Sequence, residues 1–344
     1  MENRINVEVR TCKTGDILAE DVYNCNNLKI IGKNTVINPF IKNKLVQFGV
    51  YNIKIYHAND EDEKYNEFKN EYKDTILKIK KLILGIFSEG NVDAEELINS
   101  AEVIYSKIFE ADYIIKYINE LRNGDEYTFT HSVNVAFYSM LTGKWMKLPE
   151  ENIKELIQAG ILHDIGKLKI EDKILNKPGK LTDEEFTEMK NHAAYGYDML
   201  KNNEDINDEI KKGILMHHER VDGTGYPTGA KGNEINLYAK IIAIADTYDA
   251  MTSNRVYKGK VTPFDSFKMF LTSGIRIYDI SIINVFLNNI VPFYIGANVK
   301  LNDDRRGKIV YIPPYDILSP VININNEYLD FSKKKDLSII DVVM

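Results

Sequence analysis

The chain has 344 residues, which at about 150 residues per domain predicts two or three domains. Hydrophobic residues make up 44% and charged residues 28%, as in ordinary globular proteins, so a disordered or fibrous chain is excluded. The formal net charge of −7 argues against binding to a nucleic-acid polymer, and any anionic substrate must be held by local cations.

The cysteine content and the apolar segments indicate a cytoplasmic protein. Cys12 and Cys25 are too few for a disulfide framework or a cysteine-rich metal site, which is typical of a reducing compartment. The first residues lack the apolar core of a signal peptide, and the strongest nearby apolar run, 82–87, is too short to span a bilayer. We therefore expect no membrane insertion.

Residues 1–60 predict a small mixed α/β module. Alternating apolar residues near 5–9 and 53–55 and a short apolar run at 28–32 favour strands, whereas 39–50 has a helical pattern. The module carries no catalytic constellation. It could be a sensory, docking or packing module, and packing is the commoner role.

Residues 61–122 are expected to form connecting helices. Apolar residues three or four apart form one helical stripe, consisting of Tyr65, Phe68, Tyr72, Ile76, Ile79, Ile83 and Ile86. The stripe could lie on its own core, the interpretation that we favour, or form a coiled-coil seam in a homodimer, because it repeats about every seven residues. A second helix is predicted from Asp93, a suitable N-cap, to about Leu121.

The two remaining ranges of the chain differ in their predicted secondary structure. Residues 123–290 contain helical segments separated by polar loops, whereas 291–344 alternate β-forming residues around turns, with Pro313 and Pro314 ending a strand. The predicted fold class is therefore mainly α, with an all-helical catalytic domain, the small mixed N-terminal module and a short β appendage at the C-terminus.

Histidines gather in the helical range. One of the six, His57, stands apart, and the other five are His131, His163, His192, His217 and His218. A single histidine is more often structural than a ligand. Five of them, accompanied by Asp164 and Asp246, are costly to bury without a cation, so the group indicates a metal centre.

The spacing of these residues supports that interpretation. Apolar residues continue up to His163 and Asp164, which places the pair near the end of a buried helix face. Neighbouring residues point about 100° apart on a helix, so the pair could contact different ions, or Asp164 could bridge two. The same geometry applies to residues 217–218. Gly196, four residues after His192, is predicted to leave room for a bulky group.

Imidazole and carboxylate ligands without a thiolate suit Fe, Mn, Zn, Ni or Co, and argue against a structural zinc knuckle or a calcium loop. Two such ions about 3.5–4 Å apart would hold a bridging hydroxide and stabilise negative charge on phosphoryl oxygens. The predicted chemistry is therefore the hydrolysis of phosphate esters.

The ordered set of motifs resembles one enzyme family. HDIGK at 163–167 is similar to the metal motif of HD-domain phosphohydrolases, and HHERVDGTGYP at 217–227 resembles the second motif of the HD-GYP subfamily. Matching segments also surround His131 and His192 and occupy 176–186 and 245–258. The resemblance covers roughly 123–290, about half the chain, and implies an all-helical HD-type catalytic domain.

This resemblance implies a phosphodiesterase that hydrolyses cyclic di-GMP to pGpG, and in many members onward to GMP, by attack of a metal-bridging hydroxide. The implied cofactors are two divalent transition-metal ions, with iron or manganese preferred. The implied ligands are His131, His163 and Asp246 on one ion, His192, His217 and His218 on the other, and Asp164 between them.

Further residues receive roles from the same resemblance. With Asp164, Lys167 is the expected catalytic residue, contacting the scissile phosphate or protonating the leaving oxygen. Arg255 and Lys258 match positions that bind the phosphates. Tyr226 matches a residue near a guanine, although it could equally be a turn aromatic that covers the helix below.

Three predictions concern the surroundings of the ligands. Arg220 and Asp222 are expected to brace the glycine-rich loop through a salt bridge, and Asp249 to orient a ligand histidine. Family members with a third metal have Glu four residues before the first histidine, where this chain has Tyr127. A protonated phenol is a poor ligand, so we predict two metals, which leaves the extent of hydrolysis to GMP open.

Two other functions remain compatible with these motifs. The enzyme could act on cyclic GMP-AMP or another nucleotide, because the metals contact phosphates and not bases. The chain could also be a receptor that binds the messenger without hydrolysing it. The seven intact ligands and Lys167 favour an enzyme, because a receptor does not need them.

Overall fold

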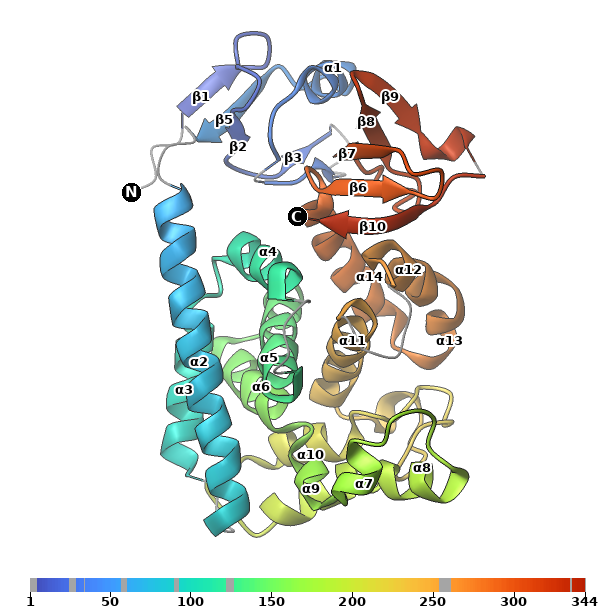
Figure 1. Cartoon of the computed structure of the whole chain (residues 1–344). Helices are drawn as coiled ribbons and strands as arrows, with labels where there is room; N and C mark the ends of the chain where they lie inside the picture. Colours follow the sequence, from blue (N-terminus) through green and yellow to red (C-terminus); the bar gives the residue numbers. More distant parts are fainter. Residues whose placement is uncertain are drawn as a thin grey trace.

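The computed structural model describes residues 5–24, 29–33, 35–56, 61–89, 93–121, 127–253, 261–334 and 336–343. A mainly helical body lies beneath two small β-containing segments, one from each end of the chain (Figure 1). This arrangement confirms the predicted fold class.

The N-terminal segment is mixed, as expected. Strands β1 (Ile5–Glu8), β5 (Asn52–Tyr56) and β2 (Ile17–Leu18) form an antiparallel sheet in the order β1-β5-β2, and β3 (Val22–Tyr23) pairs with β4 (Lys29–Ile31). Helix α1 (Pro39–Gln47) begins where the Asn38 side chain accepts a hydrogen bond from the amide of Ile41 at 2.9 Å. The helix buries Ile41 and Leu45.

The C-terminal segment forms a five-stranded antiparallel sheet in the order β10-β6-β7-β8-β9. Its strands are β6 (Asn298–Leu301), β7 (Arg306–Tyr311), β8 (Val321–Ile324), β9 (Glu327–Asp330) and β10 (Ile339–Val343), with the 3₁₀ turn η6 (Phe331–Lys333) before the last. Strand β7 ends just before Pro313, as the sequence predicts.

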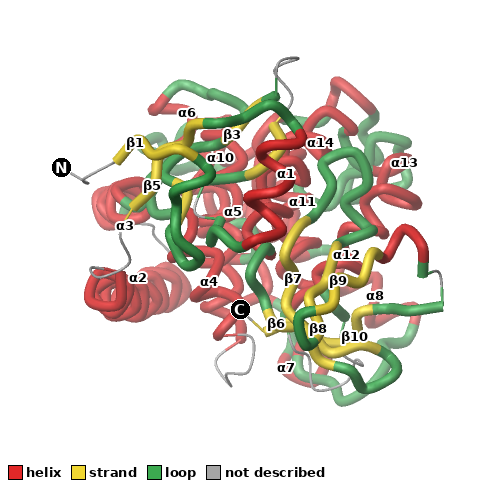
Figure 2. Tube along the Cα trace, turned by 90° about the horizontal axis from the view of Figure 1, so that it is seen from above, coloured by secondary structure: helices red, strands yellow, loops and turns green. Residues whose placement is uncertain are grey.

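The two end segments pack on each other. The ring of Phe40 on α1 lies 5.7 Å from Tyr311 and 5.2 Å from Tyr328, and Val310 and Val321 belong to the same apolar core as the N-terminal strands. Viewed from above, α1 lies between β5 and β7 (Figure 2). The ranges 1–60, 61–122, 123–290 and 291–344 stay predicted domain boundaries, and the first and last share a core.

The helical body contains α2 to α14 and several short turns. The longer helices are α2 (Glu61–Glu89), α3 (Ala94–Ser106), α4 (Ala111–Leu121), α5 (Tyr127–Trp145), α6 (Glu150–Leu162), α8 (Asp183–Lys190), α9 (His192–Leu200), α10 (Asp208–Met216), α11 (Leu237–Thr252) and α14 (Ile280–Ile290). The shorter pieces are η2 (Ile165–Lys169), α7 (Asp172–Leu175), η3 (Gly232–Glu234), α12 (Pro263–Met269), η4 (Phe270–Gly274), α13 (Ile275–Ile277) and η5 (Val291–Tyr294).

The apolar stripe of α2 faces the core of its own chain. All seven of its residues are at most 8% exposed and belong to the main core cluster, together with residues of α3, α4 and α5. The favoured interpretation is therefore confirmed, and the coiled-coil seam is wrong for this stripe, because its surface is already covered. The alternative of a homodimer through helices 61–122 loses the feature on which it rested.

The helix predicted from Asp93 to Leu121 begins correctly and ends early. The Asp93 carboxylate accepts the amide of Glu96 at 3.0 Å, but the helix stops at Ser106 and α4 begins at Ala111. At the break, the Lys144 ammonium donates to the carbonyl oxygen of Ile108 at 2.6 Å. A distant residue thus satisfies a carbonyl at the break, which the local pattern could not reveal.

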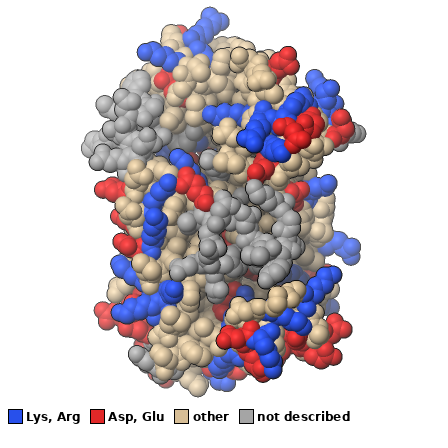
Figure 3. Space-filling model, in the orientation of Figure 1, with Lys and Arg blue, Asp and Glu red and all other residues tan. Residues whose placement is uncertain are grey.

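The surface in Figure 3 shows basic and acidic side chains interleaved over both the end segments and the helical body. Such mixing fits a modest net charge of −7. Within the described ranges, no helix has the length and apolar character needed to cross a membrane.

Candidate metal centre

The expected ligands come from five helices and the turns that follow them. His131 lies on α5 and Asp246 on α11, whereas His192 is the first residue of α9. The remaining four follow helix ends, His163 and Asp164 after α6 and His217 and His218 after α10. Packing of α6 against α5 and α10, and of α10 against α9, brings these positions together.

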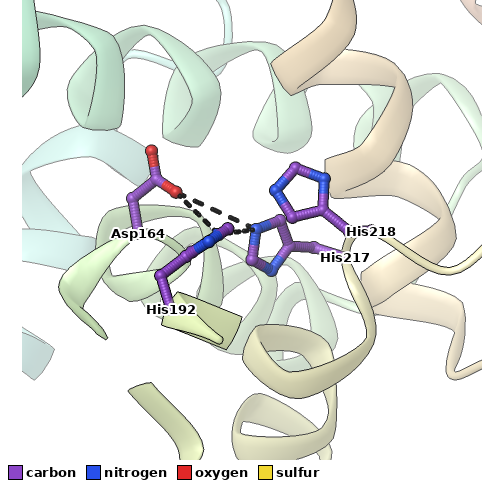
Figure 4. Close-up of side chains that lie close together, drawn as sticks. All are labelled: Asp164, His192, His217 and His218. Carbon is purple, nitrogen blue, oxygen red and sulfur yellow. Dashed lines mark hydrogen bonds and ion pairs between the residues drawn. The ribbon is translucent and has the colours of Figure 1, made fainter. Parts of the chain in front are cut away.

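Asp164 lies between two groups of imidazoles. Its Oδ2 atom is 3.3 Å from Nε2 of His163 and 3.7 Å from Nε2 of His131. Its Oδ1 atom is 3.4 Å from Nε2 of His192 and 3.9 Å from Nε2 of His217 (Figure 4). Each carboxylate oxygen therefore faces a different group, which is the geometry of a bridging ligand.

The two groups are compact and mostly buried. The potential ligand atoms in each lie within 4.8 Å of one another; one group is Asp164, His192, His217 and His218, and the other is His131, His163 and Asp164. Asp246 adds a carboxylate beside the second group, with Oδ1 at 3.1 Å from Nε2 of His131.

Backbone carbonyl groups fix the tautomers of three histidines. Nδ1 of His163, His192 and His217 donates to the carbonyl three residues earlier, at 2.8, 2.7 and 2.6 Å. A carbonyl oxygen can only accept, so each Nδ1 carries the hydrogen and each Nε2 presents a lone pair towards Asp164. Orientation of this kind is usual for metal-binding histidines.

The Nε2 atoms fit a cation better than they fit one another. Nε2 of His192 and Nε2 of His217 are 3.2 Å apart, so two lone pairs face each other. Nε2 of His163 is buried and has no hydrogen-bond partner among the residues that the structure describes. Buried polar atoms without partners are costly, and divalent transition metals would satisfy these nitrogens together with Asp164. The donor set therefore fits a binuclear centre.

His131 has a different environment. Its Nδ1 donates to Oδ2 of Asp249 at 2.7 Å, while Oδ1 of Asp249 accepts from the Asn134 amide at 2.8 Å. Asp249 thus contacts a candidate ligand as expected. The sequence argument missed Asn134, although its position three residues after His131 on the same helix face could have indicated a shared role.

The histidines differ in proton affinity. Burial lowers the pKa of His192 and His217, and it lowers the pKa of His218 to about 3. At His131 burial acts in the same direction, but hydrogen bonds to Asp246 and Asp249 outweigh it and raise its pKa to about 10. Three imidazoles are therefore neutral and ready to bind a metal, whereas His131 is held by carboxylates.

Both carboxylates of the centre are ionised. Burial acts to raise the pKa of Asp164, but the neighbouring Lys167 ammonium acts against it, and the pKa lies well below its usual value. The pKa of Asp246 is lowered in the same way, chiefly by His131, against the effect of burial. Lys167 lies on η2 with Nζ 2.5 Å from Oδ2 of Asp164, so the expected catalytic lysine lies directly at the centre.

Gly196 does not leave the predicted room for a bulky group beside His192, but allows close packing of two elements. A Cβ there would lie 3.0 Å from the Ile214 side chain and 3.4 Å from the amide nitrogen of Gly166. A Cβ on Gly166 would lie 1.9 Å from the carbonyl oxygen of His192. The two glycines therefore leave no space for a bulky group and instead let α9 approach η2, which brings His192 to Asp164.

The loop after α10 places Tyr226 over the centre. The Tyr226 ring stacks on His218 at 4.7 Å with an interplanar angle of 30°, and lies 6.4 Å from the His192 ring. Gly225 permits this turn, because a Cβ there would lie 2.4 Å from the Cα of Glu219. Tyr226 thus covers two candidate ligands.

The predicted salt bridge between Arg220 and Asp222 is wrong. Arg220 lies over the ring of Tyr278, with Cζ 4.7 Å from its centroid, and donates to the carbonyl oxygen of Glu219 at 3.1 Å. Asp222 accepts from the amide and hydroxyl of Thr224 at 3.0 and 2.6 Å. Arg220 therefore packs on an aromatic ring between α13 and α14, whereas Asp222 forms hydrogen bonds within its own turn, and the two side chains do not pair.

Glu219 braces the loop instead. Its Oε1 atom accepts from the amide and hydroxyl of Thr228 at 2.7 and 2.8 Å, and from the amide of Gly229 at 3.1 Å. The side chain is buried, and the sequence argument missed it. A carboxylate flanked by two histidines and a glycine-rich loop was the available signal.

Several predicted positions cannot be placed. Arg255 and Lys258 lie outside the described residues, as do His57 and Cys25. Tyr127 begins α5, but its side chain is not among those described. The phosphate-binding roles and the two-metal argument from Tyr127 therefore stay predictions.

Comparisons with known proteins agree with this geometry. Residues 118–282 match the family described as HD domain. The chain is 30% identical over 251 residues to a cyclic di-GMP phosphodiesterase of Pseudomonas aeruginosa, and 35% identical over 251 residues to one of Thermotoga maritima. These alignments cover 72% and 73% of this chain but only 60% and 64% of the two relatives.

Two further similarities are informative. A 3′3′-cGAMP-specific phosphodiesterase of Vibrio cholerae is 39% identical over 139 residues, covering 40% of this chain and 30% of that protein. The solved structure of Bd1817, an HD-GYP-type protein of Bdellovibrio bacteriovorus, is similar in fold, with a TM-score of 0.51, 14% identity and coverage of 83% and 98%. These findings show that the chain contains an HD domain at residues 118–282 and is similar to proteins named cyclic di-GMP phosphodiesterases, while its motifs at 163–167 and 217–227 resemble those of the HD-GYP group.

Proposed function

We propose that this protein is a metal-dependent phosphodiesterase that hydrolyses cyclic di-GMP to linear pGpG. The observation that carries the proposal is the position of Asp164, whose two oxygens face two separate groups of imidazoles. Relatives named as cyclic di-GMP phosphodiesterases support the choice of substrate.

The side chains divide the work as follows. Two bound divalent ions would activate a water molecule and stabilise negative charge on the phosphoryl oxygens. Asp164 would hold both ions at a fixed separation, while His131, His163 and Asp246 bind one and the three remaining imidazoles bind the other. Iron or manganese suits this donor set.

Lys167 is the proposed acid of the reaction. Its ammonium lies 2.5 Å from Oδ2 of Asp164, so it lies directly beside the proposed bridging ligand. From there it can contact the scissile phosphate or give a proton to the leaving 3′ oxygen. Arg255 and Lys258 are proposed phosphate contacts, and Tyr226 a guanine contact, from the family resemblance.

The decisive experiment combines metal analysis with product analysis. The protein is purified without oxygen, its iron and manganese are quantified, and the same sample is incubated with cyclic di-GMP. The proposal expects two ions per chain and formation of pGpG. Full metal loading without hydrolysis would favour the receptor function, and failure to bind metal would contradict the proposal.

A second substrate has support from the relatives. The Vibrio cholerae protein that shares 39% identity is named as specific for 3′3′-cGAMP. Cyclic di-GMP and 3′3′-cGAMP should therefore be compared by kcat/KM on one preparation. A higher value for 3′3′-cGAMP would replace the proposed substrate without changing the proposed chemistry. In the same assay, the factor by which Arg255→Ala raises KM should be larger than the factor by which it lowers metal content.

A further inference from the structure

A chain of buried hydrogen bonds leads from α2 to the metal centre. The hydroxyl of Tyr72 donates to Oδ1 of Asn134, and Nδ2 of Asn134 donates to Oδ1 of Asp249 at 2.8 Å. Oδ2 of Asp249 accepts from Nδ1 of His131 at 2.7 Å. The chain thus joins α2, α5 and α11, and it ends at a candidate ligand.

Each member of this chain is held firmly. Tyr72, Asn134 and Asp249 are 1%, 4% and 0% exposed. The Tyr72 ring stacks on Phe137 at 5.0 Å and meets Tyr117 edge-on at 5.1 Å. Packing of this kind fixes the position of the Tyr72 phenol oxygen.

The Tyr72 hydroxyl decides which way the Asn134 amide points. Oδ1 accepts from the phenol, which leaves the Nδ2 hydrogens directed at Asp249. Without the phenol the amide has no such anchor, and a reversed amide would place its oxygen against the carboxylate. Asp249 would then lose a donor and hold the His131 ring less firmly.

We propose that Tyr72 is a positioning residue of the metal centre, acting through Asn134 and Asp249 to orient His131. The inference rests on the binuclear centre of the proposed function and adds a residue from outside the HD motifs. Outer partners of metal-binding histidines commonly affect metal affinity in this way.

The test measures metal affinity in Tyr72→Phe. Co²⁺ is titrated into metal-free protein, and its visible absorption reports both affinity and ligand geometry. We expect one of two Co²⁺ ions to bind about 3- to 10-fold more weakly, below or at the lower end of the range for outer-shell partners. The matched control is Tyr65→Phe, which removes a buried hydroxyl from the same helix but leaves the hydrogen bonds from Tyr72 to His131 unchanged. Equal affinities and spectra in both variants would overturn the proposal.

A double-mutant cycle tests the route. Asp249→Asn should weaken the binding of the same ion. Adding Tyr72→Phe to it should cause little further loss of affinity, because the two residues act through one series of hydrogen bonds. Independent, additive losses would refute action through Asp249. If the unaltered protein bound no pair of ions, the proposed function itself would fail. Normal binding in both the unaltered protein and Tyr72→Phe would refute this inference alone.

Discussion

The two sides of the candidate metal centre share Asp164 but differ in chemistry. We call His131, His163 and Asp246 the acidic half, and His192, His217 and His218 the imidazole half. In the acidic half, carboxylates surround His131 and raise its pKa to about 10. In the imidazole half, burial keeps the rings neutral, and the Nε2 atoms of His192 and His217 face each other at 3.2 Å.

This difference teaches that the two ions would be held in different ways. A cation in the acidic half competes with a proton on His131, whereas one in the imidazole half relieves lone-pair repulsion. The following changes would break or sharpen that comparison.

Asp164→Ala should have the largest effect, because it removes the ligand that both halves share. We expect loss of both ions and a fall in hydrolysis of more than about 100-fold, beyond the usual effect of losing an outer partner. Metal analysis and the product assay measure these effects, with circular dichroism to confirm helical content. Asp222→Ala, in an exposed turn, is the control, and a metal-replete, active Asp164→Ala would contradict the bridging role.

His217→Ala should affect one half only. Because its Nε2 lies in the imidazole half, we expect one ion per chain to be lost and the other to remain. Metal stoichiometry after dialysis measures this, and His163→Ala serves as the reciprocal change. Simultaneous loss of both ions would show that the two halves act as one unit.

Glu219→Gln should have a smaller effect, on substrate binding rather than on metals. A neutral amide oxygen accepts the three hydrogen bonds from Thr228 and Gly229 less strongly, so the loop that carries Tyr226 loosens. Loss of about 1.4 kcal/mol would raise KM roughly 10-fold. Glu234→Gln, at the exposed end of the same loop, is the control. A change in metal content with unchanged KM would contradict the loop role.

The smallest effect on activity is expected from protonation of the histidines, because bound cations displace their protons. In the metal-free protein, however, the pH dependence of stability should distinguish the two halves. His131 has a raised pKa, so its contribution to stability is complete below 6.5 and is lost as pH rises towards about 10. His218 has a pKa lowered to about 3, so its contribution is present above 6.5 and is lost as pH falls towards 3.

Urea unfolding of metal-free protein between pH 4 and pH 10 measures both effects. His131→Gln should flatten the alkaline side of the stability profile and His218→Gln the acid side. Profiles that keep the same shape in both variants would contradict the assigned environments.

The sequence by itself predicted the helical class, the β appendage and the ligand candidates, because these depend on local patterns and on motifs. It also predicted that Asp164 could bridge, since neighbouring residues of a helix point in different directions. It could not predict how Gly166 and Gly196 pack, because that contact joins two separate elements.

Only the tertiary structure decided which oxygen of Asp164 faces which half, where the helix after Asp93 ends, and how Arg220 is held. The same is true of the connection between Tyr72 and His131. These features depend on contacts between residues tens to more than a hundred positions apart, such as His131 and Asp249. Residue spacing encodes neighbours within a helix or strand, whereas these partners are chosen by the packing of whole helices.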